Sequence, residues 1–218
     1  MDSLTCRGTL HGGKVSPSVD QYEVFLFDGM TTTQLTDDNV RDRRPEISGD
    51  TVVWGQGYET EIFVYHGTTT TQLTTNSIDN GDPRVSEGNV VWQSQLGGAP
   101  QDREIFLYDG QTTIQLTDND RIDQDHQVSG NNVVWASLFP SGFEILLYDG
   151  QSVTQLTDNN MDEWYPQVHG NNIVWQGWDG HDFEIFMATP IPEPSTCALA
   201  SLGLLGLGIF RWQRRRFC

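Results

Sequence analysis

The chain is built around one repeated unit, which is clearest between Glu104 and Trp135. A glutamate opens the same apolar run in successive copies, at intervals of 38, 43, 40 and 40 residues. The tryptophans that close the copies keep the same spacing, and we expect them to be equivalent core residues: Trp54, Trp92, Trp135 and Trp175. A repeat of this length is a supersecondary unit that stacks on its neighbours.

Each unit contains four short runs, which in the copy above read EIFLY, TTIQL, QVSG and NNVVW. They are bounded by Asp, Asn, Gly or Ser, so each unit is predicted to form four strands. Asp109-Gly110 supplies the positive φ of a tight hairpin, and Ser129-Gly130-Asn131 marks a second reversal. Because VVW and IFLY are apolar on consecutive residues, both faces of these strands should be covered.

Four strands recurring about every 40 residues favour an all-β fold, a β-propeller of four-stranded blades. Helical repeats are excluded, because no 3.6-residue periodicity occurs before residue 190. The chain enters in the middle of a unit and ends with three strands, so we expect four blades. In that arrangement the hairpin at 22–36 pairs with the last strands and removes exposed sheet edges. Five blades, or an open arc, are the alternatives.

A Gln-Leu-Thr triplet follows the first hairpin turn of each unit. The units resemble the TolB-like propeller repeat over about residues 22 to 188, which implies a propeller fold. The tryptophans that close the units are followed by Gly55, Gln93, Ala136 and Gln176 and never by Asp, so the WD type of blade is excluded. The triplets are Gln34-Leu35-Thr36, Gln72-Leu73-Thr74, Gln115-Leu116-Thr117 and Gln155-Leu156-Thr157.

Composition divides the chain into a lead-in of residues 1–20, a repeat region of 21–189 and a tail of 190–218. The net charge is −18, and residues 1–189 carry 29 acids against eight bases. Such a field repels nucleic acid and favours cations and basic partners, so no nucleic-acid partner is expected. The three cysteines lie outside the repeats and imply no disulfide framework.

No residues are arranged as a catalytic centre. The histidines occupy unrelated positions in the repeat, and we interpret them as surface or turn residues: His11, His66, His126, His169 and His181. The glutamates that recur at 61, 104, 144 and 184 are interpreted as scaffold. A binding or scaffold module is therefore expected. The alternative, a polysaccharide-active or other hydrolytic enzyme, needs a non-repeating acid pair in the central channel.

Acidic loops follow the Gln-Leu-Thr triplets, and Asp118, Asp120 and Asp123 form the densest of them. Calcium takes six to eight oxygen ligands, so these residues are weak candidates for a calcium site. The competing interpretation is a solvated turn in which Asp and Asn cap their own backbone.

The tail differs from the rest of the chain. Pro190, Pro192 and Pro194 form an extended spacer, and the 16 residues of 195–210 carry no charge. That run is at the short edge of what spans a bilayer, and its terminal position favours a transmembrane helix. The arginines that follow it are expected on the cytoplasmic side, with the propeller outside: Arg211, Arg214, Arg215 and Arg216.

Pro192-Glu193-Pro194, the apolar run and the arginine cluster together resemble a PEP-CTERM sorting signal. The resemblance implies that an exosortase removes the tail as the protein passes through the inner membrane to the cell surface or the medium. It also implies a Gram-negative producer of exopolysaccharide, with exopolysaccharide or envelope proteins as partners. Residues 1–20 lack a signal-peptide pattern, which departs from the family's usual plan.

Overall fold

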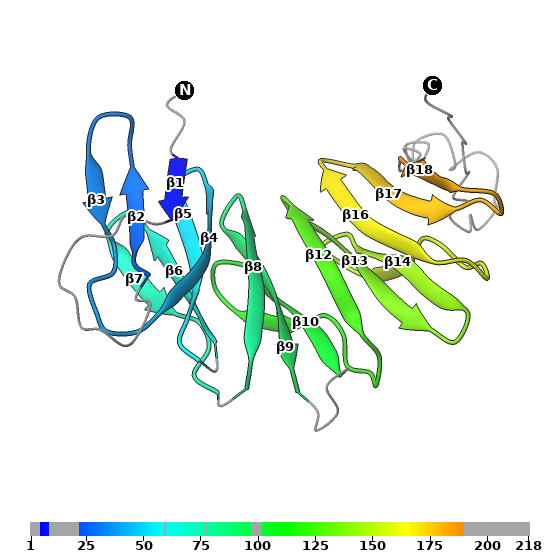
Figure 1. Cartoon of the computed structure of the whole chain (residues 1–218), viewed down its shortest axis with the longest axis horizontal. Coiled ribbons are helices and arrows are strands. Elements are labelled where there is room, and N and C mark those ends of the chain that lie inside the picture. The colour runs from blue at the N-terminus through cyan, green and yellow to red at the C-terminus, as the bar shows by residue number, and fades with distance from the viewer. Residues whose placement is uncertain (1–4, 9–21, 59, 77, 97–101, 190–218) are drawn as a thin grey trace, which may run out of the picture.

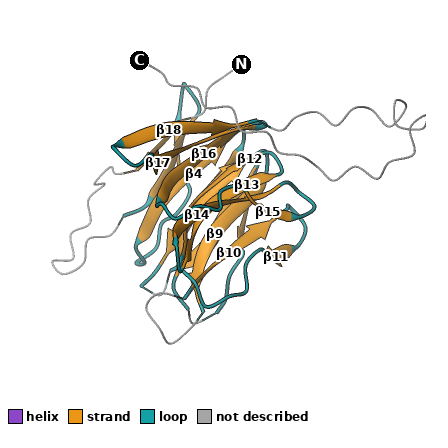
Figure 2. Ribbon diagram, turned by 90° about the vertical axis from the view of Figure 1, so that its right-hand side faces the viewer, coloured by secondary structure: helices purple, strands orange, loops and turns teal. Residues whose placement is uncertain are grey.

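The described residues form antiparallel sheets that stack face to face in an arc (Figures 1 and 2). The computed structural model describes residues 5–8, 22–58, 60–76, 78–96 and 102–189. This part of the chain is all β, and it holds no helix long and apolar enough to cross a bilayer. The predicted transmembrane helix and the arginine cluster lie outside the described residues.

Five sheets follow one another along the chain. The first contains β1 (Thr5–Gly8), β2 (Val24–Phe27) and β3 (Thr32–Gln34). The second contains β4 (Asp42–Ser48), β5 (Thr51–Gln56), β6 (Glu61–His66) and β7 (Thr69–Gln72). The third contains β8 (Asn80–Ser86), β9 (Asn89–Gln95), β10 (Arg103–Tyr108) and β11 (Thr113–Gln115). The fourth contains β12 (Asp123–Ser129), β13 (Asn132–Phe139), β14 (Gly142–Tyr148) and β15 (Val153–Gln155). The fifth contains β16 (Glu163–His169), β17 (Asn172–Trp178) and β18 (Phe183–Ala188).

The glycine turns between these strands have the geometry that the sequence predicts. Gly110 joins β10 to β11 at φ 90°, and Gly130 joins β12 to β13 at φ 55°. The hairpin after β10 is closed by the Asp109 carboxylate, whose Oδ1 accepts the Gln111 and Thr112 N–H groups at 2.9 and 2.7 Å. Local chemistry thus fixes each reversal.

Consecutive apolar residues on the second strand of a sheet face opposite neighbours. Val90 packs toward the preceding sheet, whereas Val91 packs toward the following sheet. The tryptophans lie in these interfaces with 0–1% of their surface exposed: Trp54, Trp92, Trp135 and Trp175. The second strand of these sheets is therefore covered by apolar side chains on both faces, as the consecutive pattern VVW indicates.

The number of sheets corrects the expectation of four blades. The hairpin β2–β3 pairs with β1, and within the described residues no strand of the first sheet pairs with the last. The two sheets stand at opposite ends of the arc in Figure 1. The segment around β1 has no apolar run or tryptophan to mark it as a strand. Without that strand, the first hairpin would need the last strands as partners, which is why the sequence predicts ring closure.

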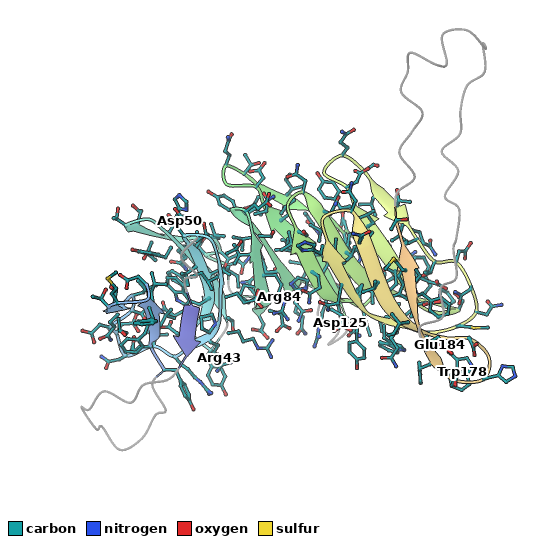
Figure 3. All side chains as sticks on the ribbon, turned by 90° about the horizontal axis from the view of Figure 1, so that it is seen from above. Arg43, Asp50, Arg84, Asp125, Trp178 and Glu184 are labelled. Carbon is teal, nitrogen blue, oxygen red and sulfur yellow. The ribbon has the colours of Figure 1, made fainter. Side chains whose placement is uncertain are left out.

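The first strands of successive sheets lie beside one another, β4 beside β8, β8 beside β12 and β12 beside β16. They form the inner edge of the arc, where the sheets converge. We call the surface along this edge the inner groove. Figure 3 shows Arg43, Arg84 and Asp125, from three of these strands, on the same side of the row of sheets.

Candidate binding groove

Every inner strand is interrupted by a β-bulge at the same place. The pairing register shifts in β4, β8, β12 and β16, and one residue inside each shift has a left-handed backbone. These residues are Arg44 at φ 50°, Asp82 at 52°, Asp125 at 55° and Tyr165 at 52°. None is glycine, so each costs roughly 1–2 kcal/mol of backbone strain that the surrounding structure must offset.

A buried polar side chain anchors the start of each bulged strand. Asp123 accepts hydrogen bonds from Trp135 Nε1 at 3.2 Å and from Asn119 Nδ2 at 2.9 Å. Asp42 accepts from Gln56 Nε2 at 2.9 Å, and burial raises the pKa of its carboxyl to about 6. The bulge is therefore tied both to the blade core and to the loop before it.

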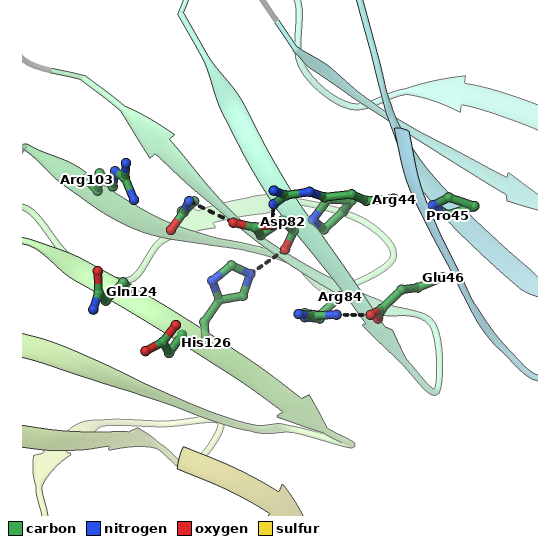
Figure 4. Close-up of a pocket in the computed structure, with 11 residues that line it drawn as sticks. Arg44, Pro45, Glu46, Asp82, Arg84, Arg103, Gln124 and His126 are labelled. Atoms are coloured by element: carbon green, nitrogen blue, oxygen red, sulfur yellow. Dashed lines mark hydrogen bonds and ion pairs between the residues drawn. The ribbon is translucent and has the colours of Figure 1, made fainter. Parts of the chain in front are cut away.

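The bulges of three neighbouring strands surround a cavity of about 500 Å³ (Figure 4). Two ion pairs cross from β4 to β8, Arg44 with Asp82 and Arg84 with Glu46. A second hollow of about 440 Å³ shares Arg44 and Pro45 with the first, so the groove continues toward β2. The first cavity is lined by Arg44, Pro45, Glu46, Asp82, Pro83, Arg84, Gln93, Arg103, Gln124, Asp125 and His126.

His126 corrects the expectation that the histidines are surface or turn residues. Its side chain is only 2% exposed, and Nε2 lies 2.6 Å from the Asp82 backbone carbonyl oxygen. Burial, followed by the charge of Arg84, lowers the pKa of His126 to about 3, so the ring is neutral at pH 7. Because a carbonyl oxygen only accepts, the neutral ring carries its proton on Nε2.

The sequence distinguishes His126 by a break in the repeat. The corresponding residues of the other inner strands are prolines, Pro45, Pro83 and Pro166, so His126 breaks the repeat at a groove position. The bulge residues, which directly precede these three prolines and His126, give a weaker signal. They are arginine, aspartate, aspartate and tyrosine, so no single residue type marks the bulge.

The recurring glutamates lie where the third strands begin. Glu104 and Glu144 are 2% and 0% exposed, and the Oε1 of each accepts a loop N–H, from Asn119 at 2.9 Å and Asn159 at 3.1 Å. Burial raises the pKa of Glu104 to about 7 and raises that of Glu144. These contacts are structural, and the side chains do not line the groove cavity.

The candidate calcium ligands are not brought together. Asp118 and Asp120 are exposed, whereas Asp123 is turned inward to Trp135. Within the described residues, the carboxylates whose oxygens approach within 4.8 Å of one another are Asp179, Asp182 and Glu184. There Asp179 Oδ1 also accepts the His181 N–H at 2.9 Å, which is the geometry of a turn.

The comparisons with known proteins address the tail and the fold separately. The family model described as "PEP-CTERM protein-sorting motif" matches residues 190–216. The chain carries a PEP-CTERM sorting signal. This signal indicates export and a place in the envelope or at the cell surface, and it implies an exosortase-type processing partner. Pro192, Glu193 and Pro194 lie in the matched segment but outside the described residues. No curated protein matches the chain.

Solved structures that resemble the chain include β-propellers. Pyrococcus horikoshii acylaminoacyl peptidase is 10% identical with a TM-score of 0.61, covering 91% of this chain and 38% of that one. The β-propeller domain of the Trilobed protease from Pyrococcus furiosus is 11% identical, TM-score 0.55, with 78% and 59% covered. TolB from Acinetobacter baumannii is 15% identical, TM-score 0.53, with 77% and 46% covered. The chain thus covers less than two thirds of the length of each of these structures. The likeness concerns the propeller fold alone.

Proposed function

We propose that this protein is an exported binding module, whose inner groove holds the ligand and whose C-terminal tail is recognised and removed by an exosortase. In this proposal Pro192-Glu193-Pro194 is the recognition motif and the apolar run holds the chain in the inner membrane until it is cut. The final arginines keep the end of the run on the cytoplasmic side.

One observation carries the binding role, namely the row of left-handed residues along the inner strands. The four repeats retain the same strained backbone but present Arg44, Asp82, Asp125 and Tyr165 at that position. A repeat that only had to stack would have no reason to keep strain at the groove, and strained backbone is typical of functional surfaces. Binding by the groove accounts for both the strain and the change of side chain.

The charged groups of the groove favour binding over hydrolysis. The enzyme alternative needs an acid pair free to act on a substrate, but Glu46 and Asp82 are each paired with an arginine. Asp125 is half-buried, and burial raises the pKa of its carboxyl against the opposing charge of Arg84. This carboxyl is suited to accept or share a proton with a bound hydroxyl group.

Processing of the tail is tested in an exosortase-bearing host that expresses the full chain behind a signal peptide. We expect the parent to become shorter by about the length of the tail, while a variant with Pro192, Glu193 and Pro194 changed to alanine stays uncut in membranes. Pro190→Ala is the matched control, since it alters the spacer only. Equal processing of the triple variant would show that the motif is incidental.

Binding by the groove is tested with a panel of probes, namely neutral oligosaccharides, acidic oligosaccharides, oligoglutamate and oligolysine. We expect at least one to bind the full chain and to lose about tenfold or more in affinity with Asp125→Ala or His126→Pro. His126→Pro restores the residue of the other repeats, which favours intact folding. Thr70→Ala, on exposed β7, is the control. Unchanged affinity in both groove variants, or no bound probe, would contradict the proposal.

A further inference from the structure

The arginines of the repeat region gather in the inner groove. Between residues 22 and 189 the only basic residues besides histidine are six arginines, set against 27 acidic residues. Five of the six line the two connected hollows: Arg41, Arg43, Arg44, Arg84 and Arg103. The remaining one, Arg121, lies over the Phe139 ring, with Cζ 4.1 Å from the ring centroid. Nearly all of the positive charge in this acidic repeat region therefore lies on one surface.

Part of this positive charge is available to a ligand. Arg44 and Arg84 pair with carboxylates, but within the described residues Arg43 and Arg103 have no ion-pair partner. In addition, Arg43 Nε and Arg84 Nε are buried without a hydrogen-bond acceptor. Those two nitrogens are closed to solvent and so to a ligand, but a guanidinium group that lines a cavity without a carboxylate partner in the described part of the chain, as in Arg43 and Arg103, favours an anionic group there.

The charge of the whole body restricts what kind of anion fits. A densely charged polyanion would be repelled by the excess of carboxylates around the groove. Exposed charges are screened beyond roughly 8–10 Å at moderate salt, so a ligand with separated anionic groups feels mainly the arginines that it touches. The ligand should therefore carry isolated carboxylates between neutral units.

The lining between the arginines favours hydroxyl groups as those neutral units. Gln93, Gln124 and Asp125 provide both donors and acceptors, and the only apolar lining residues of the main cavity are Pro45 and Pro83. A hydroxyl both donates and accepts, so it matches such a surface, whereas a peptide would need apolar pockets for its side chains. We infer that the inner groove binds an acidic saccharide, with sugar carboxylates on Arg43 and Arg103 and hydroxyls on the glutamine and aspartate side chains. This inference rests on the groove being the binding surface, as proposed above.

The test measures binding of a hyaluronan oligosaccharide, in which each uronic acid is followed by a neutral sugar, to the full chain by calorimetry, beside the same oligosaccharide with its carboxyls methyl-esterified. We expect the acid form to bind, and the ester to lose about tenfold or more in affinity, because esterification removes the charge and keeps the sugar. Arg103→Gln and Arg43→Gln should each weaken the acid form by about tenfold and leave any residual binding of the ester unchanged. Arg121→Gln removes the same charge outside the groove and should match the parent.

Other outcomes separate this inference from the proposed function. If the ester binds as well as the acid and the groove variants Asp125→Ala and His126→Pro weaken both, the groove binds a saccharide but not through its charge, and the inference is overturned while the function stands. If oligoglutamate binds and the saccharides do not, the ligand class is wrong. If no probe binds, or if Arg121→Gln weakens binding as much as Arg103→Gln, both the inference and the assignment of the groove fail.

Discussion

The repeated tryptophans join each sheet to its neighbour, and Trp135 also holds the inner strand of its own sheet. Trp135 is fully buried, and its Nε1 donates to Asp123 Oδ1 at 3.2 Å, at the start of β12. In the second and third sheets the ring stacks on a phenylalanine of the adjacent strand with centroids 5.8 Å apart, Trp54 on Phe63 and Trp92 on Phe106. Trp135 therefore links the packing of the sheets to the position of the groove.

Replacing Trp135 by alanine should destabilise the fold by about 3–5 kcal/mol, since a large buried ring leaves a cavity and Asp123 loses a donor. Denaturant unfolding of the purified chain measures the change. Trp178→Ala is the comparison, because that ring is 38% exposed near the end of the arc and should cost much less. Equal losses in the two variants would argue against the interface role.

The pH dependence of stability follows from Glu104. Burial raises its folded pKa from 4.5 to about 7, so the folded chain binds this proton more tightly than the unfolded chain does. Stability from this group is therefore present at low pH and falls as pH rises from about 4.5 to about 7. Asp42, with a pKa of about 6, acts in the same direction. His126, whose pKa is lowered from 6.5 to about 3, acts in the opposite direction below about pH 6.5, and the two carboxyls together outweigh it.

We expect the melting temperature of the parent to fall between about pH 5 and about pH 7.5, and Glu104→Gln to show a smaller fall, because the amide does not titrate. Asp120→Asn removes an exposed charge and serves as the control, with the slope of the parent. A slope that is the same in Glu104→Gln and the parent would show that Glu104 is not responsible.

At the scale of strands, the residue that begins the inner strand of the fourth and fifth sheets is matched in size to its partner on the second strand. Asp123 lies opposite Ser137, whereas the longer Glu163 lies opposite Gly177. A Cβ atom on Gly177 would overlap the Glu163 carboxylate and lie 3.1 Å from Phe186. The glycine is thus required by a close approach and not by its backbone angles.

Gly177→Ser should destabilise the fold by about 1–3 kcal/mol through overpacking. Adding Glu163→Asp recreates the Asp–Ser pair of the fourth sheet and should recover part of that loss, giving a favourable coupling in a double-mutant cycle. Thermal or denaturant unfolding of the four chains supplies the cycle. Strict additivity would mean that the two side chains do not share space.

The sequence allowed the strands and turns to be predicted but not the bulges. Asp-Gly pairs and apolar runs are local signals, and the turn glycines adopt the positive φ that they predict. The bulge at Asp125 depends on how β12 is registered against β13, which a single repeat does not reveal. The histidines occupy unrelated positions in the repeat, which predicts surface or turn residues, whereas the replacement of a repeated proline by His126 is the local sign of its buried place.

At the scale of the molecule, the two ends of the arc differ. The first sheet has no strand in the inner position, and the last sheet has none in the outer position, within the described residues. The number of sheets could not be predicted, because Thr5–Gly8 has neither the tryptophan nor the apolar run of the other second strands. Tertiary pairing with β2 makes it a strand, which overrides its weak propensity.

The stacked sheets should fold without the tail. The last strand ends at Ala188, and the proline-rich spacer that follows cannot continue its ladder. Deleting residues 190–218 should give a soluble β protein that melts cooperatively, as circular dichroism would show. A longer deletion that begins at Phe183 should reduce stability sharply, since it removes Phe186 from its stack with Trp175. Aggregation of the shorter deletion would contradict the separation of fold and tail.

The row of bulges also bears on how such a groove changes over generations. Each of the four inner strands contributes one strained residue whose side chain is not needed for stacking, since arginine, aspartate and tyrosine all occur there. A single codon change at this position alters the surface of the inner groove and leaves the anchor, the tryptophan and the turns intact. Duplication of a unit copies the anchor and adds one more variable residue. The fold can therefore stay the same while the side chains that line the inner groove change.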